Sequence, residues 1–134
     1  GRLLLASGGW EGYNLGIHEL AHKLDMLNGA ANGMPPLHSS MQVKDWTQAM
    51  QQAYDHLNHY LDHHNPDHAP IDPYAAENPA EFFAVTSEYF FSAPDLLSHA
   101  YPLVYQQLSL FYRQDTLARL KQLQSEHPEY RAQH

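Results

Sequence analysis

The segment at residues 78–91 constrains the fold of this chain more than any other, because its side chains are apolar almost all round a helix. It begins with Asn78 and Pro79, residue types preferred at the cap and at the first position of a helix. A helix that is apolar on nearly every side is buried among other elements. The sequence therefore predicts a helix in the core of the protein, extending to about Phe91.

Two acidic residues, Glu81 and Glu88, share one stripe of this apolar helix. An ionised carboxylate in such surroundings costs several kcal/mol unless a cation or strong hydrogen-bond donors compensate it. A metal ion would compensate one of them. Glu81 also stands at the third helical position after Asn78, so a capping box with Asn78 is an alternative account of this residue.

The rest of the chain reads mainly as helices. Residues 2–6 predict a short buried strand, closed by turns at Gly8, Gly9 and Gly12. A helix is expected from residue 14 to about 27, and a second is expected to follow a cap at Ser39 or Ser40 and to run to about residue 62. The buried face of the first is expected to consist of Ile17, Leu20, Ala21, Leu24 and Leu27, and that of the second of Trp46, Met50, Ala53, Leu57 and Leu61.

Prolines mark the second half of the chain. Residues 64–73 are rich in Pro and Asp and predict a long loop. Pro94 is expected to end the apolar helix, and two more helical segments are expected after Pro102 and after a break at residues 114–115. Their apolar positions are Val104, Leu108 and Phe111 in the first and Leu117, Leu120 and Leu123 in the second.

Length and charge narrow the possible functions. With 134 residues we expect a single domain over residues 1–134, and because the chain opens at Gly1 and runs directly into the expected strand, we interpret it as the C-terminal part of a longer protein. A net charge of -8 argues against direct binding to nucleic acids, and no apolar run is long enough for a membrane span. The chain has no cysteine, so any metal must be held by His, Asp or Glu.

The first expected helix carries the pattern HExxH at residues 18–22. Two histidines four residues apart project from one helix face and can share a zinc ion, while Glu19 is close enough to take a proton from a water molecule there. The alternative is that His18 and His22 are surface imidazoles paired with Glu19 or Asp25. The longer pattern with a third histidine is missing, so Glu81 is the candidate third ligand, and Asp25 is the candidate carboxylate that orients an imidazole.

Two long motifs, at residues 13–25 and 72–91, together resemble the Mlc titration factor A family of zinc peptidases, and the chain resembles the C-terminal, metal-binding half of its members. The resemblance implies that His18, His22 and Glu81 bind zinc and that Glu19 is the general base. It also implies that Tyr74 stabilises the oxyanion, since related metallopeptidases of the lethal-factor type place a tyrosine seven residues before the ligand glutamate. Without the resemblance, Tyr74 reads equally as a loop aromatic that covers the core.

The resemblance further implies aminopeptidase activity on short peptides and binding to the glucose-responsive repressor Mlc in the bacterial cytoplasm. The expected fold is α+β of the zincin type, with a small strand region near the N-terminus and four or five helices, two of which meet at the metal. Two other functions stay open: a non-catalytic, zinc-containing module that sequesters the repressor, and a metal-free helical fragment. Loss of half a domain would expose apolar surface, so self-association is also expected.

Histidines recur between residues 56 and 68, at His56, His59, His63, His64 and His68. The pair His59 and His63 again has the spacing of four that suits a metal. No carboxylate pattern or buried flank accompanies it, so we interpret the stretch as a solvated helix end that could bind Zn²⁺ or Ni²⁺ adventitiously.

Overall fold

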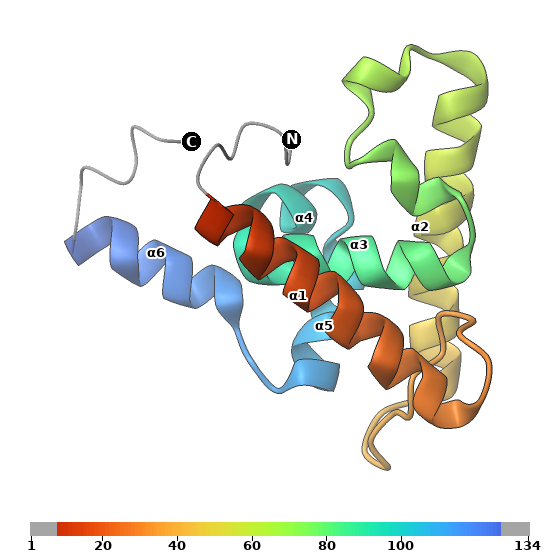
Figure 1. Cartoon of the computed structure of the whole chain (residues 1–134), viewed down its shortest axis with the longest axis horizontal. Coiled ribbons are helices and arrows are strands. Elements are labelled where there is room, and N and C mark those ends of the chain that lie inside the picture. Colours follow the sequence, from red (N-terminus) through yellow and green to blue (C-terminus); the bar gives the residue numbers. More distant parts are fainter. Residues whose placement is uncertain (1–7, 127–134) are drawn as a thin grey trace.

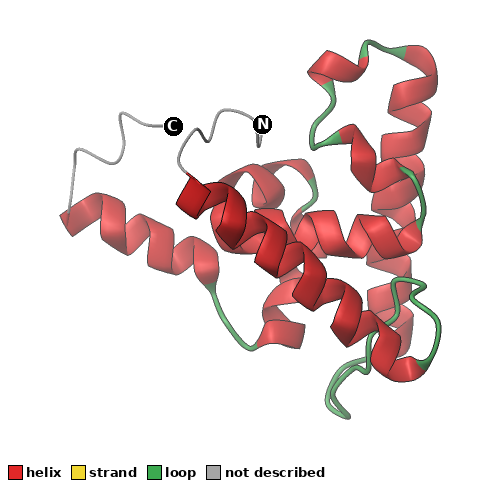
Figure 2. Cartoon of the chain, in the orientation of Figure 1, coloured by secondary structure: helices red, strands yellow, loops and turns green. Residues whose placement is uncertain are grey.

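The structure, a computed structural model, describes residues 8–126 of the chain, with side chains from residue 15 onward. Every regular element in this part of the chain is a helix, which confirms the mostly helical expectation (Figure 2). The strand expected over residues 2–6 lies outside the described residues. The elements are α1 (Gly8–Asp25), η2 (Met26–Asn28), α2 (Val43–His63), η3 (Pro66–His68), η4 (Pro73–Ala76), α3 (Pro79–Ser92), α4 (Pro94–Ala100), α5 (Pro102–Tyr112) and α6 (Thr116–Glu126).

The apolar helix α3 lies among the other helices, as the sequence predicts. Nine of its fourteen residues are buried, and α1, α2, α4, α5 and η4 all contact it (Figure 1). Its start also matches the prediction, because the side chain of Asn78 accepts a hydrogen bond from the backbone N–H of Glu81 at 2.9 Å and Pro79 is the first helical residue. The carboxylates that α3 carries are therefore mounted on a firmly packed element.

Helix α2 confirms the predicted inner face, with Trp46, Ala53 and Leu57 buried against the core. The predicted cap at Ser39 or Ser40 is wrong. The helix begins at Val43, and no side chain caps it. Burial of Trp46, whose indole N–H also donates to the carbonyl of Gly33 at 3.2 Å, fixes this helix by tertiary contacts.

A short helix, α4, was not predicted, because Pro94 reads as a stop signal. Pro94 does end α3, but it is also the first residue of α4, and Pro102 starts α5 in the same way after the single residue Tyr101. Proline lacks an N–H and has a φ suited to the first helical turn, so it can end one helix and begin the next. The two segments expected after Pro102 and after residues 114–115 are confirmed as α5 and α6.

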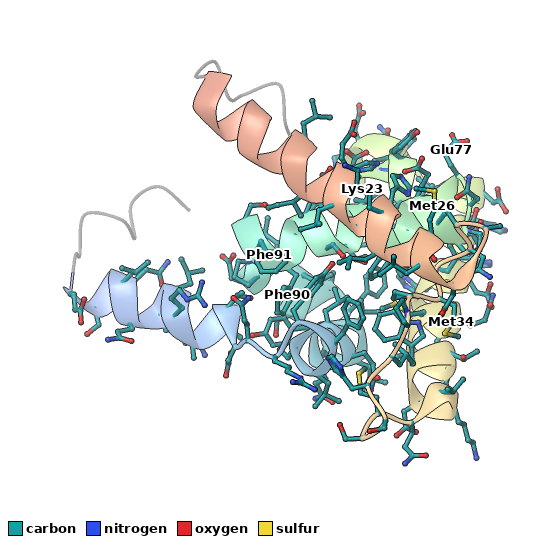
Figure 3. All side chains as sticks on the ribbon, turned by 60° about the horizontal axis from the view of Figure 1, so that its bottom comes forward. Lys23, Met26, Met34, Glu77, Phe90 and Phe91 are labelled. Atoms are coloured by element: carbon teal, nitrogen blue, oxygen red, sulfur yellow. The ribbon has the colours of Figure 1, made fainter. Side chains whose placement is uncertain are left out.

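Helix α6 is joined to the rest at its start, where the backbone N–H of Leu117 donates to the Tyr105 hydroxyl at 2.9 Å. The hydroxyl of Thr116 donates to the carbonyl of Phe90 at 2.6 Å. Figure 3 shows Phe90 and Phe91 at the end of α3 that lies toward α6, while Glu77 marks the opposite end. None of the helices described here combines the length and the apolar character that crossing a bilayer requires.

Helix α1 starts earlier than expected and is rotated about its axis. It begins at Gly8, so the turn expected at this point is wrong; glycine lowers helix propensity without excluding a helix. Ala21 and Asp25 are fully buried, whereas Leu20 and Leu27 are 53% and 69% exposed. The face turned toward α3 is thus the polar strip with the two histidines, about a quarter of a turn from the apolar stripe expected to be buried. Self-association of the chain stays a prediction.

Candidate metal centre

The polar strip of α1 meets the first turn of α3 at three side chains, His18, His22 and Glu81. Oε1 of Glu81 lies 2.9 Å from Nε2 of each histidine, and the two Nε2 atoms lie 3.1 Å apart. Within residues 8–126 this is the one group of at least three His, Asp or Glu side chains whose candidate ligand atoms gather within 4.8 Å. The structure brings together the three residues expected to bind the metal, and it does not support the alternative that the histidines are surface imidazoles paired with Glu19 or Asp25.

The N-terminus of α3 decides between the two accounts of Glu81. Its backbone N–H does bond to the side chain of Asn78, as in any such cap. Its carboxylate, however, contacts the two histidines and the hydroxyl of Tyr74. The cap therefore orients the start of α3 and leaves the carboxylate of Glu81 to the site.

The donor set fits a cation. Nδ1 of His18 lies 2.7 Å from the Glu88 carboxylate, to which it donates, so the Nε2 of the neutral ring carries a lone pair. That lone pair, Nε2 of His22 and Oε1 of Glu81 converge on one point. A single proton placed there could form a hydrogen bond between only two of these three atoms, whereas a metal ion could bind all three. Ligand atoms of a tetrahedral zinc ion lie about 3.3 Å apart, since each is about 2.0 Å from the metal. Separations of 2.9–3.1 Å are close to that requirement.

Neighbouring groups shift the pKa values of both His18 and Glu81. The hydrogen bond to Glu88 raises the pKa of His18 above its ordinary value, although burial of the ring opposes this. Burial pushes the pKa of Glu81 upward, but the hydrogen bond and charge of His22, together with the Tyr74 hydroxyl, outweigh it and hold the pKa below its ordinary value. The site thus keeps an anionic oxygen beside two imidazoles.

Tyr74 lies beside this group, on η4. Its hydroxyl donates to Oε2 of Glu81 at 3.1 Å, and the centre of its ring is 6.3 Å from that of His18. The side chain is 45% exposed, which does not suit an aromatic that covers the core. The turn is held from two sides, because Asp72 accepts from the backbone N–H of Tyr74 at 3.0 Å and its own N–H donates to the Tyr89 hydroxyl at 2.9 Å. Helix α3 thus positions the tyrosine as well as the glutamate.

Glu19, the predicted general base, is exposed on α1 directly after His18. On a helix it lies about 100° round from His18 and about 60° from His22, at the solvent edge of the strip. Its role as a base stays a prediction.

The expectation that Asp25 orients an imidazole is wrong. Asp25 is fully buried, and its two oxygens accept from the backbone N–H groups of Gly33 at 2.7 Å and Met34 at 3.1 Å. The loop after α1 folds back and needs an acceptor there, which a helical wheel cannot reveal. The carboxylate on the far side of an imidazole is Glu88, which the sequence places on the same stripe of α3 as Glu81 but does not assign to a histidine.

The histidine-rich stretch runs along the end of α2 into η3, and its five histidines are exposed. The rings of His59 and His63 are 4.2 Å apart, and Nδ1 of His63 donates to the carbonyl of His59. Nδ1 of His56 lies 2.9 Å from the Tyr101 hydroxyl. The first pair of contacts lies within α2 and the other is to a tyrosine, so within the described residues these histidines do not assemble a third metal ligand.

The comparisons with known proteins, by family model and by similar sequences, agree with one another. The family model of the glucose-regulated metallo-peptidase M90 matches residues 4–113 of the chain. The chain is 53% identical over 116 residues to Mlc titration factor A of Yersinia enterocolitica, covering 86% of the chain and 43% of that relative. It is 53% identical over 111 residues to proteins of the same name in Yersinia pestis and Yersinia pseudotuberculosis, covering 82% of the chain and 41% of each. The chain therefore spans about two fifths of the length of these curated relatives.

Proposed function

Because the chain belongs to the glucose-regulated metallo-peptidase M90 family, we propose that it is the part of a zinc peptidase that holds the metal. The residues that would hold the zinc ion are His18, His22 and Glu81. The observation that carries this proposal is the convergence of two Nε2 atoms and one carboxylate oxygen within 2.9–3.1 Å. Two histidines and one glutamate are a ligand set of catalytic zinc sites, where one position stays open for water or substrate.

When bound, zinc would polarise the scissile carbonyl and make a nearby water molecule a stronger acid. Glu19 would accept the proton of that water and pass it to the leaving amine, which its place beside His18 and its exposure permit. Tyr74 would turn its hydroxyl from Glu81 toward the oxyanion, to which it would donate. The packed helix α3 would keep these groups in register.

Substrate and partner are part of the same proposal. We expect aminopeptidase activity on short peptides, in line with the family resemblance of the two motifs. The relatives are named for titrating Mlc, and we propose that the protein binds this repressor in the bacterial cytoplasm. The net charge of -8 supports an effect on transcription through a protein and not through contact with DNA.

The metal site can be tested by removing one ligand at a time. Glu81→Ala and His22→Ala should each abolish tight binding of one equivalent of zinc, measured by competition with a chelator of known affinity. His59→Ala is the matched control, since His59 belongs to an exposed histidine pair of the same spacing. Loss of the tight equivalent in the control would move the site to α2.

Catalysis separates the enzyme from a second candidate, a zinc-containing module that only sequesters the repressor, which the name of the relatives favours. In the intact protein, Glu19→Gln should keep zinc and repressor binding but lower peptide hydrolysis by roughly 10²-fold or more. Glu77→Gln, an exposed glutamate beside η4, should change nothing. Activity within a few-fold of wild type in Glu19→Gln would remove Glu19 from the mechanism. An inactive wild type that binds zinc and repressor would establish the module.

A further inference from the structure

Glu88 is a buried carboxylate that the mechanism above does not use. It is 4% exposed, in the middle of the most buried helix of the described chain. One of its oxygens lies 2.7 Å from Nδ1 of His18, a short separation typical of a charge-assisted hydrogen bond. Glu88 follows Glu81 by two helical turns, so α3 presents both carboxylates to the same face of α1.

The ring of His18 spans these two carboxylates. Its Nδ1 bonds to Glu88, and its Nε2 faces Glu81 at 2.9 Å. An ionised carboxylate only accepts, so Nδ1 must carry the hydrogen, which leaves Nε2 free to act as a ligand. The choice of tautomer and the plane of the ring are therefore both set by Glu88.

His22 provides an internal comparison. Its Nε2 contacts Glu81 and His18, but within the described residues its Nδ1 has no hydrogen-bond partner, and its side chain is 26% exposed against 14% for His18. Nε2 of each histidine lies 2.9 Å from Oε1 of Glu81, and the two rings differ in what holds their far side. His18 is preorganised and His22 is adjustable.

We propose that Glu88 is a positioning residue that locks His18 as the Nδ1–H tautomer with Nε2 directed at the metal position. This inference rests on the proposed metal site, and it adds a residue on which that site depends. A carboxylate on the far nitrogen also makes the ligand nitrogen more basic, and outer partners of this kind typically change metal affinity by 10- to 100-fold. A role confined to stability would leave both the tautomer and the affinity of the folded protein unchanged.

Three variants separate these roles. Glu88→Leu removes the acceptor and keeps the bulk, while Glu88→Gln keeps an acceptor oxygen and removes the charge. Ser87→Ala is the matched control, because Ser87 is the neighbouring buried polar residue and bonds to the Tyr112 hydroxyl at 2.8 Å, away from the histidines. Each variant is checked for folding by circular dichroism, then assayed for zinc affinity by chelator competition and for the His18 tautomer by imidazole ¹⁵N shifts of the metal-free protein, at a pH where the ring is neutral.

We expect a zinc Kd about 10- to 100-fold weaker in Glu88→Leu, with loss of the pure Nδ1–H tautomer. Glu88→Gln should keep the tautomer and weaken zinc about 10-fold. Ser87→Ala should leave both readouts unchanged even where its thermal stability falls. An affinity within twofold of wild type, or an unchanged tautomer, in Glu88→Leu overturns the inference, and if that variant does not fold, unchanged affinity in Glu88→Gln does so. If the wild type binds no zinc, the proposed metal site fails, whereas the tautomer in the metal-free protein still tests the hold on His18.

Discussion

Substituting Asp25 by asparagine tests whether this buried carboxylate serves the fold or the metal. Asparagine keeps the shape, but its single oxygen can accept from only one of the two backbone N–H groups, those of Gly33 and Met34, that Asp25 now satisfies. The other N–H would face the amide NH₂, so one charge-assisted bond is lost and a buried donor is left unpaired. Together these cost about 3 kcal/mol.

That cost converts into a measurable change in melting temperature. The entropy of unfolding is about 0.25 kcal/mol/K for a domain of this length, so a loss of about 3 kcal/mol lowers Tm by about 12 °C. Thermal unfolding followed by circular dichroism measures it, with Asp62→Asn as the control that removes the same charge at an exposed position of α2. Zinc affinity of the folded variant should stay within a few-fold of wild type, because Asp25 bonds to the loop and not to an imidazole. If Tm falls by less than about 3 °C, or if zinc affinity weakens more than tenfold, this assignment of Asp25 to the fold is refuted.

Three further outcomes are expected. Tyr74→Phe deletes the hydroxyl that reaches Glu81 and should lower kcat by about 10- to 1,000-fold at unchanged zinc content and nearly unchanged Tm, since the ring is 45% exposed; an unchanged kcat would exclude it from the mechanism. Gly33→Ala should destabilise by at least about 2 kcal/mol in denaturant titration, because its φ is +81° and a Cβ would lie 2.7 Å from the carbonyl oxygen of Pro79; wild-type stability would mean that the loop is free to move. Burial raises the pKa of Tyr101 and of Tyr112 to about 12, so the contribution of these two tyrosines to stability should be constant below pH 10 and be lost between pH 10 and 12, and Tyr112→Phe should remove about half of that loss, measured by urea titration across this range.

Local signals were sufficient for much of the fold. Asn78 and Pro79 marked the start of α3 correctly because capping and a fixed φ act within one turn. The same local reasoning failed at Pro94, because one proline can end a helix and begin another. Whether a second helix follows depends on tertiary contacts, here the burial of Leu97 in the core. The rotation of α1 was also beyond local reasoning. It follows from the need of two α3 carboxylates for donors, which outweighs the burial of Leu20 and Leu27.

The site residues, too, were predicted correctly where local spacing decides and wrongly where it does not. Helical spacing placed His18 and His22 on one face, and the cost of a buried charge correctly directed attention to α3, where Glu81 meets them. Spacing also favoured Asp25 as the carboxylate that orients an imidazole, and this was wrong, because Asp25 bonds to the loop and Glu88 bonds to His18. Which carboxylate reaches which ring depends on how α1 crosses α3 and on where the following loop turns back. Those are relations between segments far apart in the sequence, which periodicity within one helix does not contain.

The connections of α3 also bear on the order in which the chain folds. Helices α3, α4 and α5 follow one another with single residues, Ala93 and Tyr101, between them, so their contacts are local and need little closure of the chain. The contact between His18 and Glu81 instead joins positions 63 apart and must overcome the entropy of closing the segment between them. We expect the α3 to α5 unit to form early and α1 to dock late. The ligand set would then be complete only in the last stage of folding, so that binding of a metal ion would indicate that the helices are already packed as in the native fold.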